Sequence, residues 1–95
     1  MSYEYRPLSQ ETLARIIRTR SITINGLTEI ELHPETRWVV IRNVSSNPIY
    51  LGNETVSEAD GFVLKTDEII SLNVLPGFKV YVFASSAEIR VMEAE

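Results

Sequence analysis

The single histidine is the first residue to test for chemistry. His33 is directly followed by Pro34 in this 95-residue chain. A catalytic dyad needs a nucleophile and an orienting carboxylate brought to the histidine, and a histidine metal site usually takes two or more imidazoles. The chain has no cysteine, which removes thiolate nucleophiles, thiolate metal ligands and disulfides. The sequence therefore predicts a turn histidine in contact with water.

Oxygen-bearing side chains gather between residues 53 and 60. Asn53, Glu54, Glu58 and Asp60 could offer hard oxygens to Ca²⁺, but their spacing matches no calcium-loop motif and fits a solvated polar loop. Two carboxylates at glycosidase spacing remain possible on sequence grounds. The four glycines are isolated turn residues and form no phosphate-binding loop. We expect no enzyme activity, no bound metal and no cofactor.

Charge is unevenly distributed along the chain. Residues 1–20 hold four arginines and two glutamates, a net charge of +2, whereas residues 21–95 hold five basic and eleven acidic side chains, a net charge of -6. An acidic body repels phosphate, so we expect no nucleic-acid partner. No apolar run approaches the roughly 18–20 residues that cross a bilayer, and the N-terminus lacks the apolar core of a signal peptide. We expect a soluble protein with no membrane partner.

The pattern that would position these side chains is that of short β-strands. Alternating apolar and polar residues run from Ile70 to Val74 and from Phe78 to Ala84, and Gly, Pro, Asn, Asp or Ser residues bound each apolar run. Asn25-Gly26 predicts a tight hairpin, and Ser85-Ser86 predicts the last turn. Seven or eight short strands at a spacing of about 8–12 residues indicate an all-β, single-domain antiparallel β-sandwich or jelly roll.

The first residues carry a weaker pattern. Ser9 could cap a short helix that ends near Ile17, and the competing interpretation is a strand through Ile16–Ile24. We expect an N-terminal arm or short helix over residues 1–18 and a β-sandwich domain over residues 19–95.

More apolar side chains are present than one small core can bury. Trp38, Ile41, Ile69, Tyr81 and Phe83 alternate with residues that should face the core, so they should lie on outer sheet faces. Either neighbouring segments half-bury them, or they contact identical subunits or a larger partner.

Four segments of the chain resemble small β-sandwich virion proteins of tailed bacteriophages. They are the run Arg37-Trp-Val-Val-Ile-Arg-Asn-Val-Ser-Ser-Asn-Pro-Ile-Tyr-Leu-Gly52, then Gly61-Phe-Val-Leu64, Glu68-Ile-Ile-Ser-Leu72 and Ala87-Glu-Ile-Arg-Val91. The resemblance covers roughly residues 32–92. Such proteins often carry a glycine-proline turn before the glutamate that opens the next strand, and here Lys65-Thr66-Asp67 replaces it.

The resemblance implies a capsid decoration, or cement, protein that binds the outer shell and stabilises it through protein-protein contacts. Its implied partners are the major capsid protein and its own copies, in a homotrimer, on the capsid surface of a virion after synthesis in the host cytoplasm. A tail- or fibre-associated module that binds a carbohydrate or receptor is the alternative.

Contact residues are expected in the arm and on the outer sheet faces. We select them for aromatic, apolar or arginine character. They are Tyr3, Tyr5, Arg6, Arg15, Arg18, Arg20, Trp38, Ile41, Tyr81 and Phe83.

Overall fold

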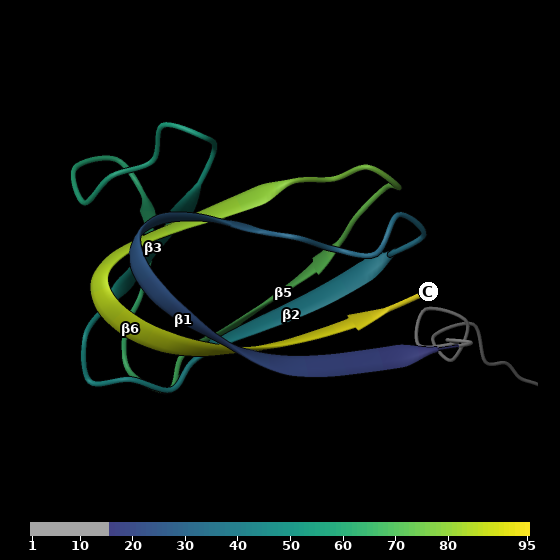
Figure 1. The fold of residues 1–95 in the computed structure, drawn as a ribbon, viewed down its shortest axis with the longest axis horizontal. Helices are drawn as coiled ribbons and strands as arrows, with labels where there is room; N and C mark the ends of the chain where they lie inside the picture. Colours follow the sequence, from purple (N-terminus) through teal and green to yellow (C-terminus); the bar gives the residue numbers. More distant parts are fainter. Residues whose placement is uncertain (1–15) are drawn as a thin grey trace, which may run out of the picture.

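A computed structural model describes residues 16–95, and all of their regular structure is β-strand (Figure 1). The predicted all-β class is therefore confirmed. Six strands follow one another along the chain: β1 (Ile17–Ile30), β2 (Trp38–Asn43), β3 (Ile49–Gly52), β4 (Phe62–Leu64), β5 (Ile69–Asn73) and β6 (Val80–Ala94).

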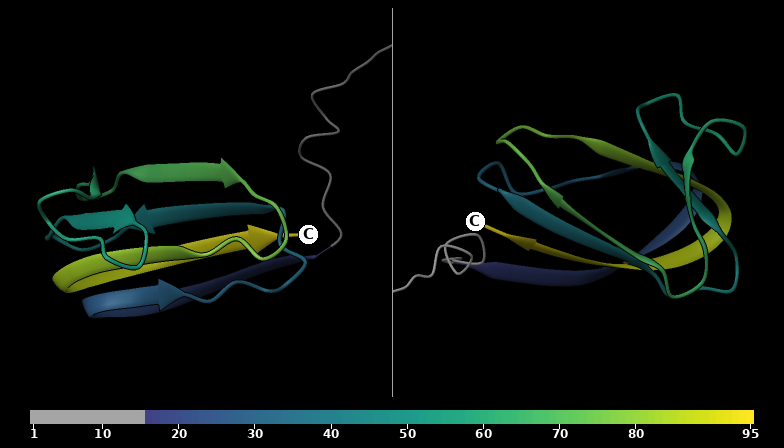
Figure 2. Two further views of the ribbon diagram at one scale, coloured as in Figure 1. Left: turned by 90° about the horizontal axis from the view of Figure 1, so that it is seen from above. Right: turned by 180° about the vertical axis from the view of Figure 1, so that it is seen from behind.

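Strand β6 is the centre of one curled antiparallel sheet. On one side it pairs with β1 along almost its whole length, from Val80 to Ala94. On the other side its first residues pair with β3, and its last residues pair with β2. Strands β4 and β5 extend β3 and β2. Both long strands bend, so each of them contributes to two halves of the sheet. One half contains β4, β3 and the adjoining parts of β6 and β1, and it curls over the other half, which contains β5, β2 and the remaining parts of β6 and β1 (Figures 1 and 2). We call them the half β4-β3-β6-β1 and the half β5-β2-β6-β1.

Two predicted turns are wrong, because both positions lie inside long strands. Ile24 pairs with Ala87 and Gly26 pairs with Ala84, so Ser85 and Ser86 stand opposite a single residue of β1. This two-against-one arrangement is a β-bulge, which bends a strand and strengthens its twist. Gly26 has a φ of 87°, which suits glycine at this bend. The described chain therefore has two long strands and four short ones instead of seven or eight short strands.

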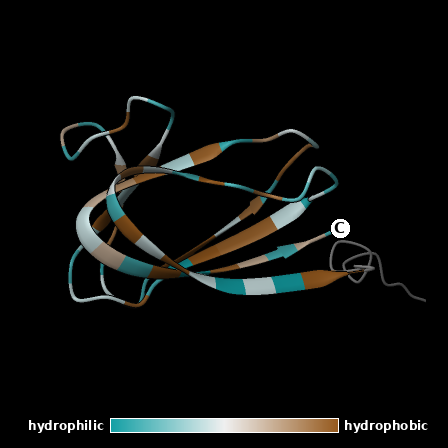
Figure 3. Cartoon of the chain, viewed as in Figure 1, coloured by the Kyte–Doolittle hydropathy of each residue, from teal (hydrophilic) through white to brown (hydrophobic). Residues whose placement is uncertain are grey.

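The bulge also explains which side chains of β6 reach the core. Val80, Val82 and Ala84 face inward before it, and the inward positions become odd-numbered after the extra residue, as at Ile89 and Val91. Figure 3 shows the related alternation of hydrophilic and hydrophobic bands along β1. The core fills the space inside the curl and comprises Ile24, Ile30, Val39, Ile41, Ile49, Leu51, Leu64, Val74, Val80, Val82, Ala84, Ala87, Ile89 and Val91.

Ile41 does not lie on an outer face, contrary to the prediction. It is fully buried in β2, where it pairs with Val91 of β6 and Ile70 of β5. Because side chains alternate along a strand, burial of Val39, Ile41 and Asn43 leaves Trp38, Val40 and Arg42 outside. Val39, Val40 and Ile41 are all apolar, so hydropathy alone could not distinguish the two faces.

The loop from residue 53 to residue 61 is anchored by one apolar side chain. Val56 is buried against the end of β3, and a Cβ atom added at Gly61 would lie 2.5 Å from Tyr50 Cβ and 2.8 Å from Val56 Cγ2. Asp60 Oδ1 accepts a hydrogen bond of 2.9 Å from the backbone N–H of Ser57, and Asn53 Oδ1 accepts one of 3.0 Å from that of Thr55. These oxygens support the loop's own turns.

The predicted arm lies almost wholly outside the described residues. Tyr3, Tyr5, Arg6 and Arg15 belong to this unplaced part, as does most of the proposed short helix. Strand β1 already begins at Ile17, so Arg18 belongs to the sheet.

Candidate functional site

An apolar row crosses the outer face of the half β4-β3-β6-β1. Leu27 of β1 stands opposite Phe83 of β6, Phe83 stands opposite Tyr50 of β3, and Tyr50 stands opposite Val63 of β4. Directly opposed residues share a face of the sheet, with Cβ atoms about 4.5–5.5 Å apart. Leu27 and Val63 are exposed, and the two aromatic residues between them are half-buried. We call these four residues the outer row.

Tyr81 lies beside the outer row on the same face of β6. Its hydroxyl donates a 3.4 Å hydrogen bond to Glu29 Oε1 on β1. Loss of solvent around the phenol, followed by the nearby Glu29 carboxylate, raises the pKa of Tyr81. The phenol therefore stays protonated and able to donate at neutral pH. Tyrosine and phenylalanine are enriched at protein interfaces, so this face has the composition of a contact surface.

Trp38 lies on the outer face of the other half, away from the outer row. Its Nε1 donates a 2.9 Å hydrogen bond to Ser71 Oγ on β5, which holds the indole against the sheet. A shallow groove of about 450 Å³ on this half is lined by Val40, Ile69 and Met92 together with Arg42 and Arg90. Arg42 contacts Asp67 at 3.2 Å, and Arg90 contacts Glu88 at 3.7 Å, so both guanidinium groups have carboxylate neighbours.

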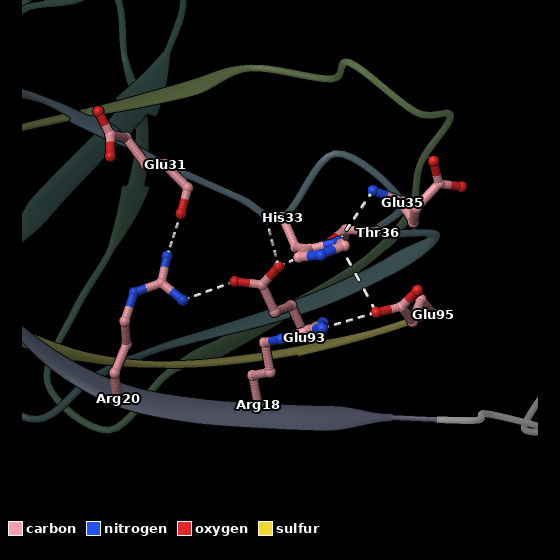
Figure 4. A network of polar contacts seen from close by, with 8 residues as sticks. All are labelled: Arg18, Arg20, Glu31, His33, Glu35, Thr36, Glu93 and Glu95. Carbon is pink, nitrogen blue, oxygen red and sulfur yellow. Dashed lines mark hydrogen bonds and ion pairs between the residues drawn. The ribbon is translucent and has the colours of Figure 1, made fainter.

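Arg18 and Arg20 point into the open end of the curl. Arg18 Nη2 lies 2.7 Å from Glu95 Oε2, and Arg20 Nη1 lies 2.5 Å from Glu93 Oε2 (Figure 4). Arg20 also donates to the backbone carbonyl of Glu31. Both arginines, which were expected to contact a partner, therefore tie β1 to the end of β6 and to the loop that follows β1.

Glu93 is the centre of this polar network. Its side chain is only 1% exposed. It accepts hydrogen bonds from Arg20, from the Thr36 hydroxyl and, at 2.8 Å, from the backbone N–H of His33. Burial alone would raise the pKa of this carboxyl, but the hydrogen bonds and the charge of Arg20 outweigh it and lower the pKa below its ordinary value. Glu93 is therefore an ionised, fully partnered buried carboxylate.

His33 belongs to the same network and has the position of a turn residue. Its Nδ1 accepts a 3.1 Å hydrogen bond from the backbone N–H of Glu35 and lies 3.7 Å from Glu95 Oε2. Within residues 16–95, no three His, Cys, Asp or Glu side chains are grouped as metal ligands. In the same part of the chain, no helix is long and apolar enough to span a membrane.

Sequence reasoning selected Tyr81 and Phe83 for the outer face, and the structure places both there. It did not select Leu27, Tyr50 and Val63 as their neighbours, because cross-strand neighbours depend on strand order. The Glu93 network was also missed, since Met92–Glu95 gives no signal in the sequence beyond its carboxylates.

Comparisons of the chain with protein-family models, with curated proteins and with solved structures find no match. Any assignment of function therefore depends on the geometry above and on the resemblance of the sequence motifs.

Proposed function

We propose that the protein is a structural component of a tailed-phage virion, a capsid decoration protein that binds the outer shell through protein-protein contacts. The observation that carries the proposal is the outer row, an apolar strip across four strands whose end residues, Leu27 and Val63, are exposed. Surfaces of this kind mark protein interaction sites on small soluble proteins. The resemblance to small virion proteins supplies the partner, the major capsid protein.

The finer fold assignment belongs to the same proposal. A curled sheet whose two halves enclose one core is compatible with a β-sandwich of the jelly-roll type, the architecture that the resemblance implies. A homotrimer on the shell and a contribution of the arm residues to shell binding are further parts of the proposal, and both derive from the resemblance and the charge pattern.

The copy number of the chain in purified phage particles tests this function. We expect quantitative mass spectrometry to find it in a ratio near one to the major shell protein, since cement must cover the shell. A few copies per particle would instead favour the tail- or fibre-associated module, for which the half-buried Trp38, Tyr50, Tyr81 or Phe83 would be stacking platforms for a sugar. Absence from particles would contradict both.

The outer row itself is tested by adding charge at its exposed ends. We expect the double variant Leu27→Lys, Val63→Lys to reduce affinity for undecorated shells by about tenfold or more, because a lysine ammonium would have to be desolvated in the contact. Sedimentation of the variant with undecorated particles measures the loss.

Leu75→Lys is the matched control for this experiment. Leu75 is the most exposed large apolar side chain among residues 16–95, at 78%, and it lies in the loop between β5 and β6, outside the row. Equal binding by the double variant and the wild type would exclude the outer row as the shell contact.

A further inference from the structure

Strand β1 is a long sheet edge. Within residues 16–95 it pairs with β6 alone, so its other side has no strand neighbour over 14 residues. The left view of Figure 2 shows β1, in purple and blue, at the margin of the sheet. Strands β4 and β5, the other margins, have only three and five residues. Unpaired edges are templates for pairing with another chain.

The backbone bonds show which groups this edge presents. Glu95 N–H donates to the Ile16 carbonyl at 3.1 Å, and Val44 N–H on β2 donates to the Glu88 carbonyl at 3.1 Å. Hydrogen-bonded pairs alternate along antiparallel strands, so the even-numbered residues of β1, as far as Ile24, direct their backbone N–H and C=O groups to β6. The odd-numbered residues therefore direct their N–H and C=O groups to the open edge. They are Ile17, Thr19, Ser21 and Thr23.

This stretch carries little of the usual protection of an edge. From Ile17 to Ile24 the sequence is Ile-Arg-Thr-Arg-Ser-Ile-Thr-Ile, which contains no proline and no lysine. Its two arginines point inward to Glu95 and Glu93, so the outward side chains are uncharged. Inward-pointing charges can also protect a sheet edge, but here both arginines are paired with glutamates, and within residues 17–24 no charged side chain on the outer face opposes a second strand.

We propose that the open edge of β1 pairs antiparallel with the same edge of a second copy, about a twofold axis at Ser21. Ser21 then faces the second copy's Ser21, and Thr19 faces its Thr23. Every hydrogen-bonded pair joins odd-numbered residues, whose N–H and C=O groups point to the open edge, and about six N–H···O=C hydrogen bonds form. The contact is isologous, so it closes as a dimer.

The arginines disfavour the two registers whose axis lies nearer the start of β1. Moving the axis to Arg20 would place Arg20 opposite the second copy's Arg20, and moving it to Thr19 would place Arg18 opposite Arg20. Like charges directly opposed destabilise a sheet. With the axis at Ser21, Arg18 and Arg20 face Ile24 and Ile22, and the contact ends before the bend at Gly26. This inference does not depend on the proposed function.

The test uses the full chain and measures mass by sedimentation equilibrium over a concentration series. We expect a dimer for the wild type in solution, where no shell is present to assemble the proposed homotrimer. Ser21→Pro should raise the dissociation constant by about tenfold or more, because its N–H serves only the outer edge. The variant should keep the circular dichroism of the wild type.

Charge exchange tests the register independently. Thr19→Lys with Thr23→Lys places like charges in opposed pairs and should give a monomer, whereas Thr19→Lys with Thr23→Glu places opposite charges there and should restore the dimer. Thr66→Lys, in the exposed turn after β4, is the control for added charge. A monomeric wild type at about 100 µM, or a dimer or trimer that survives both Ser21→Pro and the double lysine change, would overturn the inference. Particle binding is measured separately, so failure here leaves the decoration proposal to its own test.

Discussion

Replacement of Ile41 by alanine is expected to lower the free energy of unfolding by about 2–4 kcal/mol. The side chain is fully buried between β5 and β6, and its truncation removes apolar contacts and leaves a cavity that the neighbouring strands fill only in part. Urea denaturation followed by tryptophan fluorescence measures the change, because Trp38 lies on the same strand.

Ile69→Ala is the matched control for this measurement. Ile69 begins β5, next to Ile70, the residue that pairs with Ile41, and its side chain is 57% exposed. The same truncation there should change the unfolding free energy by less than about 0.5 kcal/mol. Equally small losses at the two positions would mean that β2 is shifted by one residue and that Ile41 faces outward, as predicted from the sequence.

Arg20→Ala is expected to destabilise the fold by about 2–3 kcal/mol. The substitution leaves the buried Glu93 carboxylate without the one cation that pairs with it among residues 16–95, although the Thr36 hydroxyl and the His33 backbone N–H remain as donors. Arg42→Ala is the control, because its pair with Asp67 is exposed on both sides and should contribute less than about 0.5 kcal/mol. Thermal or urea unfolding of the two variants at pH 7 compares them directly.

The same network predicts the response to acid. Glu93 has a lowered pKa in the folded state, so its contribution to stability is complete above its unfolded pKa of about 4.3 and is lost as the pH falls through the folded value. We expect Glu93→Gln to be less stable than the wild type at pH 7 and to lose less stability between about pH 5 and pH 3. Parallel stability curves for the two proteins over this range would contradict a charged, stabilising Glu93.

Much of the fold could be predicted from local patterns. The apolar runs at Ile49–Leu51 and Phe62–Leu64 are strands, as predicted. The side chains of β6 that point into the core also agree with the apolar pattern, at Val80, Val82, Ile89 and Val91. Asn25-Gly26 and Ser85-Ser86 were misjudged for one shared reason. Residues that permit a hairpin also permit a bulge, and only the pairing of β1 with β6 decides between the two.

The face of the sheet that a side chain occupies is harder to predict where consecutive residues are all apolar, or where the residue is charged. The apolar run Val-Val-Ile in β2 is compatible with either alternation of inward and outward side chains. The pairing of β2 with β5 on one side and β6 on the other places Ile41 in the core. In the sequence, Arg18 and Arg20 resemble surface residues of an arm. In the structure they point inward, because they donate hydrogen bonds to Glu95 and Glu93, more than 70 residues later in the chain. Such long-range partners have no local signature.

Local patterns along the chain were sufficient to predict the all-β class, most strand positions and the excess of aromatic and apolar side chains, because each depends on spacing and on turn residues within a few positions. Three features of residues 16–95 became known only from the folded chain: two long strands bend together, four residues from four strands form the outer row, and β1 presents an open edge. These features depend on strand order and register, which arise from contacts between residues far apart in the chain.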